Sequence, residues 1–217
     1  MESLLQKQRQ VTSEWHVEQA KALLDYAQKN CSATALVYSS LEARIGVERF
    51  VFEMSVLACG GAFTADELRQ ASKKDGAFGL LDRKIGDYRR YLEFCNLISE
   101  VNHLSIRVPI PDVRRFRRLI TDLSDYCHFQ RDPAETVDDP HQTWLVKGIA
   151  VVQGAIELLT ELLQNQRGSI PRDTMPPEVR DLLDHYMAGQ CDLQTARIQL
   201  EIMSPVLEAR MRDRLTM

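Results

Sequence analysis

The long run of residues between Ser32 and the Gly60–Gly61 pair contains no proline and is apolar on more than one side. At helical spacing, one face holds Leu41, Ile45 and Phe52, whereas other faces hold Val47, Phe50 and Met54. Glycines commonly end a helix, because they accept the left-handed conformation that follows its last turn. A helix that is apolar nearly all round is usually enclosed by its neighbours. The sequence therefore predicts a central helix after Ser32 that ends at Gly60–Gly61.

Apolar residues at three- and four-residue spacing predict helices through most of the remaining chain. Capping residues and glycine or proline stops place them at about 12–30, 64–74, 80–100, 112–127, 142–166, 178–188 and 193–203, with final turns to 214. Ser204–Pro205 is expected to end the helix that begins at Leu193. Pro109 and Pro111 favour an extended segment, and the acidic stretch 128–140 is expected to be a loop. No alternating pattern predicts a sheet, so the expected fold class is all-α, a multi-helix bundle.

Residues 168–177 contain three prolines and a glycine and are the strongest linker candidate in the chain. We therefore divide the sequence into a main helical bundle, residues 1–167, and a small C-terminal helical appendix, residues 168–217. The appendix is too short to bury a core of its own, so it is expected to dock on the bundle or on a partner. A chain of 217 residues can fold without a metal or disulfide.

The five cysteines lie far apart and form no CxxC pair, which excludes the common zinc and redox motifs. Their odd number argues against a secreted disulfide framework, so buried or half-buried free thiols and a cytoplasmic location are expected. The longest apolar run, 148–159, contains Gln153 and Glu157 and is too short to span a bilayer. Residues 1–10 lack the apolar segment of a signal peptide. Neither a membrane anchor nor a cofactor is expected.

Four arginines follow Asp112, the expected N-cap of the helix over 112–127. They share an arc of about 160° on that helix and are Arg114, Arg115, Arg117 and Arg118. Positive charge in the first turns of a helix opposes the helix dipole, so an anionic partner is expected there. The candidates are a nucleic-acid backbone and an acidic protein segment such as the downstream loop, which carries Asp132, Glu135, Asp138 and Asp139. The protein segment is favoured, because nucleic-acid surfaces are usually broader and more basic.

The charged residues of the expected central helix include Glu42, Arg44, Glu48 and Arg49. Arg44 with Glu48, and Arg49 with Glu53, have the i,i+4 spacing that stabilises a helix by about 0.2–0.5 kcal/mol per pair. Charges on a central helix need partners on other helices. We interpret these residues as a buried polar centre that fixes helix register, with the lining of a cleft as the alternative.

Two groups of carboxylates with a histidine have helical spacing: Asp122, Asp125 and His128, and Asp181, Asp184 and His185. Carboxylate and imidazole are suitable metal ligands. Neither group matches a motif with a dedicated mechanism such as HExxH, and the sequence also lacks a Walker loop, GxGxxG and GxSxG. Solvated acidic faces are therefore expected, and no metal site is predicted.

The segment Tyr38–Glu53, YSSLEARIGVERFVFE, resembles a helix common in small bacterial all-α proteins of the HEPN-like family. The resemblance implies a helical bundle that often dimerises and occurs in toxin–antitoxin or phage-defence systems. Active members are metal-independent ribonucleases, whose signature is an arginine and a histidine separated by four to six residues. Arg180 with His185, and Arg9 with His16, have that spacing. In such chemistry His185 is the general acid/base for attack by a ribose 2′-hydroxyl, and Arg180 stabilises the phosphorane.

The favoured function is therefore a protein-interaction or oligomerisation module, a homodimer or a subunit or regulator in a bacterial defence-type assembly. The helix over 142–166 and the C-terminal helices are its expected interface elements, with leucines such as Leu159 as contacts. The alternative is an HEPN-like ribonuclease that uses Arg180 and His185. Nucleic-acid binding through the four arginines is compatible with either function.

Overall fold

The computed structural model describes residues 12–71, 76–104, 107–127, 143–164 and 169–215. Regular structure in these ranges is helical throughout and contains no strand, so the prediction of an all-α multi-helix bundle is confirmed. The elements are α1 (Ser13–Asn30), α2 (Ala33–Ala58), α3 (Ala65–Ala71), α4 (Gly76–Lys84), α5 (Tyr88–Val101), α6 (Val113–Cys127), α8 (Thr143–Gln164), the 3-10 helix η1 (Arg172–Thr174), α9 (Pro177–Met187) and α10 (Leu193–Leu215).

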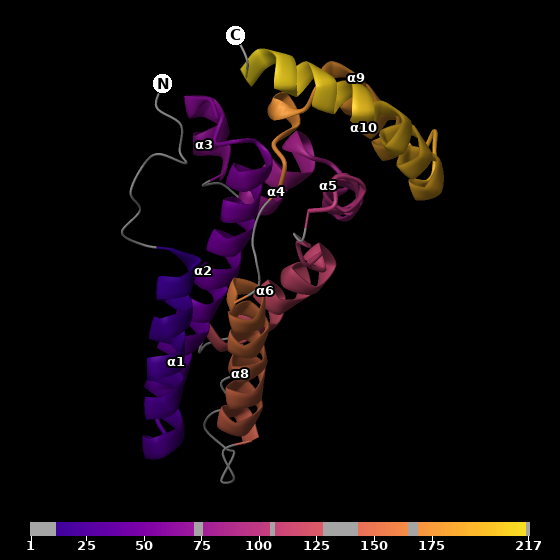
Figure 1. The fold of residues 1–217 in the computed structure, drawn as a ribbon. Coiled ribbons are helices and arrows are strands. Elements are labelled where there is room, and N and C mark those ends of the chain that lie inside the picture. The colour runs from indigo at the N-terminus through magenta and orange to yellow at the C-terminus, as the bar shows by residue number, and fades with distance from the viewer. Residues whose placement is uncertain (1–11, 72–75, 105–106, 128–142, 165–168, 216–217) are drawn as a thin grey trace.

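α2 is the central helix of the molecule. It packs against α1, α4, α6 and α8, and Figure 1 shows α1, α2 and α8 as long neighbouring helices. Leu36, Val47 and Val51 of α2 are fully buried, so the prediction of a central apolar helix is confirmed. Tyr38 and Leu41 of the same helix are 55% and 38% exposed. The prediction that neighbours enclose this helix nearly all round is therefore wrong for one of its faces.

Polar contacts as well as apolar packing join α1 to α2. The carboxylate of Glu53 in α2 accepts hydrogen bonds from the backbone N–H and the hydroxyl of Ser13, at 3.0 and 2.6 Å. A carboxylate at this place also interacts favourably with the N-terminal end of the α1 dipole. Nearer the turn, Ser39 of α2 donates to the carbonyl of Ala20 at 2.6 Å. These contacts fix the register of the α1–α2 hairpin.

The single helix predicted over 80–100 is wrong, because the structure divides that region into α4 and α5. Gly86 adopts a φ of +75°, a left-handed conformation that is typical of helix ends. Asp87 then caps α5, since its side chain accepts hydrogen bonds from the backbone N–H groups of Arg89 and Arg90. Gly86 thus ends one helix and Asp87 begins the next. The apolar residues keep helical spacing across this break, so their spacing alone predicts one continuous helix.

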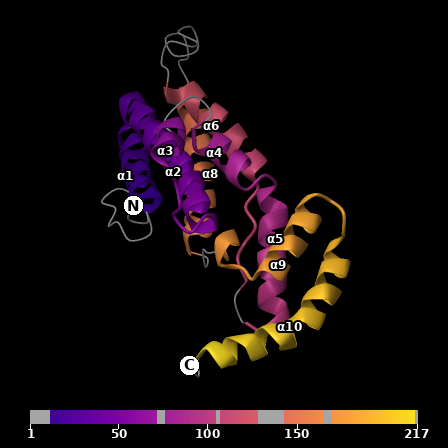
Figure 2. The same cartoon turned by 90° about the horizontal axis from the view of Figure 1, so that it is seen from above.

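The predicted stop at Ser204–Pro205 is also wrong, because α10 continues through Pro205 to Leu215. Proline lacks the N–H of one helical hydrogen bond and bends a helix where it occurs in its interior. Figure 2 shows α10 as a curved helix. The missing hydrogen bond is therefore accommodated by curvature and does not end the helix.

The chain after residue 168 packs on α5. α9 and α10 both contact α5 and each other, and Figure 2 shows these three helices side by side. Val179, Leu183 and Tyr186 of α9 belong to the same continuous apolar core as Phe94 of α5. Met175, which follows η1, is buried in that core as well. The C-terminal segment thus completes the core that the earlier helices form.

Two glycines of α8 lie in opposite packing environments. A Cβ atom added at Gly148 would lie 2.6 Å from Leu36 Cδ2 and 2.7 Å from Tyr126 Cδ1, whereas one added at Gly154 would meet nothing within 4 Å. We expect Gly148→Ala to lower the free energy of unfolding by about 1–3 kcal/mol through overpacking. Gly154→Ala should raise it by up to about 1 kcal/mol, because alanine is the better helix former. Urea denaturation measures both values, and equal effects would contradict close packing of α8 on its neighbours.

Candidate functional site

The outward face of α2 exposes apolar side chains. Tyr38 and Leu41 are exposed on it, and Val37 is half-buried beside them. With Arg44 and Cys127 they line a groove of about 530 Å³ whose walls are mostly apolar. Cys127 is the last residue of α6, so the groove runs between α2 and the end of α6.

Helical geometry explains why these residues share one face. At 100° per residue, seven exposed or half-buried positions between Thr34 and Glu48 lie within about 60° on either side of Leu41. The buried residues of the same stretch point the opposite way. Ser40, at the edge, donates to the carbonyl of Leu123 in α6 at 2.7 Å. We call this outward face the α2 surface; it consists of Thr34, Val37, Tyr38, Leu41, Arg44, Ile45 and Glu48.

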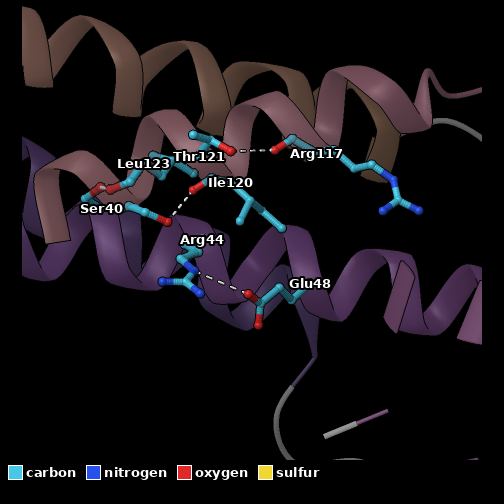
Figure 3. A network of polar contacts seen from close by, with 8 residues as sticks. Ser40, Arg44, Glu48, Arg117, Ile120, Thr121 and Leu123 are labelled. Carbon is cyan, nitrogen blue, oxygen red and sulfur yellow. Dashed lines mark hydrogen bonds and ion pairs between the residues drawn. The ribbon is translucent and has the colours of Figure 1, made fainter. Parts of the chain in front are cut away.

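The α2 surface has a charged rim. Arg44 Nε donates to a carboxylate oxygen of Glu48 at 3.3 Å, and the two side chains are 32% and 45% exposed. Figure 3 shows this pair on α2, with Ser40 of the same helix beside Ile120 and Leu123 of α6. An exposed pair of this kind contributes only a few tenths of a kcal/mol, so it leaves both groups available to a partner.

The four charged residues predicted as a buried polar centre are half-buried and do not form one cluster. Glu42 lies on the far side of α2 from the Arg44–Glu48 pair and bonds to Nδ1 of His16 in α1 at 2.7 Å. Glu53, the expected partner of Arg49, accepts hydrogen bonds from the start of α1. The prediction is corrected for a physical reason: these positions lie at the seams between α2 and its neighbours, where long side chains still reach water.

The arginines of α6 fall into two groups. Arg114, Arg115 and Arg118 are exposed and pair with no carboxylate in the described part of the chain. Arg117 pairs with Asp82 of α4 at 2.5 Å, and its guanidinium lies 4.8 Å from the centroid of the Phe78 ring. Figure 3 shows Arg117 pointing away from the Arg44–Glu48 pair. All four arginines are therefore exposed, and one of them, Arg117, also ties α6 to α4.

The rest of the solvent-facing side of α6 is acidic. Asp122 and Asp125 are exposed and lie in the same arc as Arg114 and Arg118, nearer the C-terminal end. This side of the helix is therefore mixed in charge and not a broad basic surface. The acidic segment 128–140, which the sequence suggested as a partner for the arginines, lies outside the described residues, and both anionic partners stay predictions.

The structure does not bring Arg180 and His185 into one site. Arg180 Nη2 donates to the carbonyl of Met175 at 3.2 Å. His185 is exposed, and its Nδ1 lies 2.7 Å from the carbonyl oxygen of Asp181. It lines a groove of about 380 Å³ between α9 and α10 that Arg180 does not line. Arg9, from the second pair with this spacing, lies outside the described residues.

No group of three or more His, Cys, Asp or Glu side chains within the described ranges is arranged to hold a metal ion. Asp184 of the second acidic group pairs with Arg172 at 2.5 Å, and His128 of the first group lies outside the described residues. Across the same ranges, no helix combines the length and the apolar character that crossing a bilayer requires.

The cysteines offer no activated nucleophile in the core. Burial raises the pKa of Cys95 to about 11, so this thiol is protonated and unreactive at neutral pH. Burial is also the main cause that raises the pKa of Cys59 and of Cys127, both of which are half-buried. Cys31 is exposed and is the exception to the prediction of buried or half-buried thiols.

Apart from the two grooves, a cavity of about 280 Å³ lies where the end of α2 meets α5 and α9. Lys84, Arg172 and Asp184 line it, but their charges are balanced within the protein. Lys84 pairs with Glu67, and Arg172 pairs with Asp184, each at 2.5 Å. Asp173 also lines the cavity, so most but not all of its charged lining is paired within the protein.

Helix α8, an expected interface element, turns its apolar side into the core. Leu145, Val152 and Leu159 are 6%, 0% and 0% exposed. The prediction that Leu159 is a surface contact is therefore wrong, because α8 packs on α1, α2 and α6 through that side. On α10, in contrast, Ile198 and Ile202 are exposed at 49% and 70%.

Comparison with family models, with curated proteins and with solved structures finds no match. The candidate site is therefore the α2 surface, an exposed apolar face of the central helix. Sequence reasoning missed it, because Tyr38 and Leu41 belong to a helix that is apolar on several faces, and the pattern does not say which face lacks a neighbour. The one available signal is the helical spacing that places Tyr38 and Arg44 beside Leu41.

Proposed function

We propose that this protein is a protein-interaction module whose contact face is the α2 surface. The observation that carries the proposal is the exposure of Tyr38 and Leu41 on the central helix, beside a mostly apolar groove. Apolar area removed from water contributes about 25 cal/mol per Å², so a partner that covers this groove gains binding energy from both side chains. Tyrosine is also enriched among the residues that dominate interface energies.

The composition of the α2 surface supports the same function. Its centre holds Val37, Leu41 and Ile45, and its rim holds the Arg44–Glu48 pair. An apolar centre within a polar rim is the usual organisation of a protein–protein interface. The side chains also stand on a regular helix that α1 and α6 hold in place, so little conformational freedom is lost on binding.

Within this function, we propose a homodimer, or a subunit or regulator of a bacterial defence-type assembly. The support for this narrower statement is the likeness of Tyr38–Glu53 to a helix of HEPN-like proteins, since that segment contains most of the α2 surface. No contact among the described residues favours the alternative ribonuclease function, because Arg180 and His185 have separate surroundings.

Native mass spectrometry of wild type and Leu41→Glu tests this function, with the protein alone and with its genomic neighbours co-expressed. We expect wild type to form a stoichiometric assembly and Leu41→Glu to weaken it at least about 30-fold, as a charge in an apolar interface centre does. Val146→Glu is the matched control, because Val146 is 63% exposed on α8 and lies outside the α2 surface. An assembly that survives Leu41→Glu unchanged, with both variants folded by circular dichroism, would contradict the proposal.

A further inference from the structure

We propose that the groove between α9 and α10 binds a basic amphipathic helix of another protein. This groove, of about 380 Å³, is called the α9–α10 groove below. No residue lines both it and the groove beside the α2 surface, so the two sites are separate. Two features of its surroundings define the partner: apolar area that is open to solvent, and exposed charge of one sign.

The α9–α10 groove has an apolar floor between two helices. Leu182 of α9 is buried, whereas Met203 of α10 and Cys191 of the connecting turn are half-buried, and all three line the groove. α9 and α10 contact each other, and Figure 2 shows them side by side. A floor of this kind receives the apolar side chains of an amphipathic helix, which is a common mode of peptide recognition.

An exposed apolar strip continues from the groove onto α10. Ile198 and Ile202 are 49% and 70% exposed, and Pro205 follows on the same side of the helix. Ile202 lies about 60° around α10 from Gln199, which lines the groove. A helix is about 10 Å wide, so one that rests in the groove also covers Ile202. The apolar area that it removes from water adds to binding.

Negative charge surrounds the α9–α10 groove. Within the described stretch 175–205, every exposed side chain of the Asp, Glu, Lys and Arg types is a carboxylate: Glu178, Asp181, Asp184, Asp192 and Glu201. Glu178 and Asp181 line the groove itself. A partner that brings lysine or arginine side chains beside these carboxylates gains electrostatic attraction, whereas an acidic partner is repelled.

The arginines near the groove are bound within the protein. Arg197 is half-buried and pairs with Glu100 of α5. Arg180 is half-buried as well and donates to a backbone carbonyl. Arg172, just before this stretch, is exposed but pairs with Asp184. The groove therefore presents apolar area beside net negative charge, which fits a helix with basic residues next to its apolar ones.

Peptide binding to the full chain, measured by fluorescence anisotropy, tests the inference. The probe is a labelled, end-capped peptide of about 18 residues, or five helical turns, with leucine along one side and lysine along the other. The comparison peptide has glutamate in place of every lysine. We expect the lysine peptide to bind with a Kd below about 100 µM, at least about tenfold more tightly than the glutamate peptide. Added salt should weaken this binding, because it screens exposed charges.

Two substitutions locate the binding site. Asp181→Lys reverses a charge in the groove and should weaken binding of the lysine peptide at least about tenfold. Ile202→Gln removes an apolar contact without changing the charge and should weaken it about fivefold. The matched controls are Asp122→Lys, which reverses an exposed charge on α6, and Leu41→Glu, which changes the α2 surface. Both should bind within about twofold of wild type, because distant exposed charges are screened.

Selective weakening in Asp181→Lys and Ile202→Gln, with native helix content by circular dichroism, would support the inference. Equal binding of the two peptides would overturn the basic character of the partner. Equal weakening by Asp122→Lys and Asp181→Lys would overturn the groove as the site and leave only a general attraction to an acidic chain. Weakening by Leu41→Glu would assign the peptide to the α2 surface instead. Absence of binding up to about 500 µM peptide would overturn the inference as a whole.

Discussion

Replacing Leu159 with alanine should lower the free energy of unfolding by about 2–5 kcal/mol. Leu159 lies on α8 with none of its surface exposed, and its Cδ1 atom lies 3.5 Å from the point that a Cβ on Gly46 of α2 would occupy. Deleting its side chain removes the contacts that hold α8 against α2 and leaves a cavity that helices packed this closely fill only in part. Urea denaturation followed by circular dichroism at 222 nm measures the change as a lower midpoint.

The matched control is Val146→Ala on the same helix. Val146 is 63% exposed, so this substitution should change the free energy of unfolding by no more than about 0.5 kcal/mol. If the surface-contact prediction for Leu159 were right, the two substitutions would have similar small effects on stability, and Leu159→Ala would act on assembly alone. That outcome would contradict the position of Leu159 in the core.

Replacing Tyr186 with alanine should cost about 3–5 kcal/mol and should loosen α9 from α5. The Tyr186 ring stacks on Phe94 with 5.9 Å between the ring centroids, and the guanidinium of Arg90 covers it. Its hydroxyl donates to a carboxylate oxygen of Glu93 at 2.9 Å, and its carbonyl accepts a hydrogen bond from Arg90. One side chain of α9 thus contacts three residues of α5. In Tyr186→Ala, amide hydrogens of α9 should exchange faster under conditions in which the rest of the protein stays folded.

The variant Tyr186→Phe distinguishes the contribution of the ring to stability from that of the hydroxyl group. It keeps the stacking and should cost about 1.5–3 kcal/mol, the range for a hydrogen bond to a charged group. Burial, followed by the hydrogen bond to Glu93, raises the pKa of Tyr186 to about 12 from its ordinary value of 10. The difference in the free energy of unfolding between wild type and Tyr186→Phe is therefore fully present below pH 10 and is lost as the pH rises toward 12. A difference that stays constant between pH 10 and pH 12 would contradict the raised pKa of Tyr186.

Much of the fold could be predicted from local signals. Apolar spacing and capping residues predicted α1, α2, α6, α8 and α9 to within a few residues. The errors arose where two local signals overlap or compete. At Gly86–Asp87 the apolar spacing continues across a real break, and at Pro205 a strong breaker lies in a helix that bends and continues.

The candidate site was less predictable. The shared face of the α6 arginines follows from their spacing, and all four are indeed exposed. The pairing of Arg117 with Asp82, 35 residues away, could not be predicted, because it depends on how α4 packs beside α6. The same holds for Arg180 and His185, which have a suggestive spacing but different surroundings.

By itself, the sequence determined the all-α class, the central position of α2 and most helix ends, because these depend on side chains within a few residues of each other along the chain. Only the tertiary structure decided that Leu159 belongs to the core and that Tyr38 and Leu41 face outward. Exposure is the sum of contacts with residues distant in sequence, and a helix that is apolar on several faces does not specify which face its neighbours leave open.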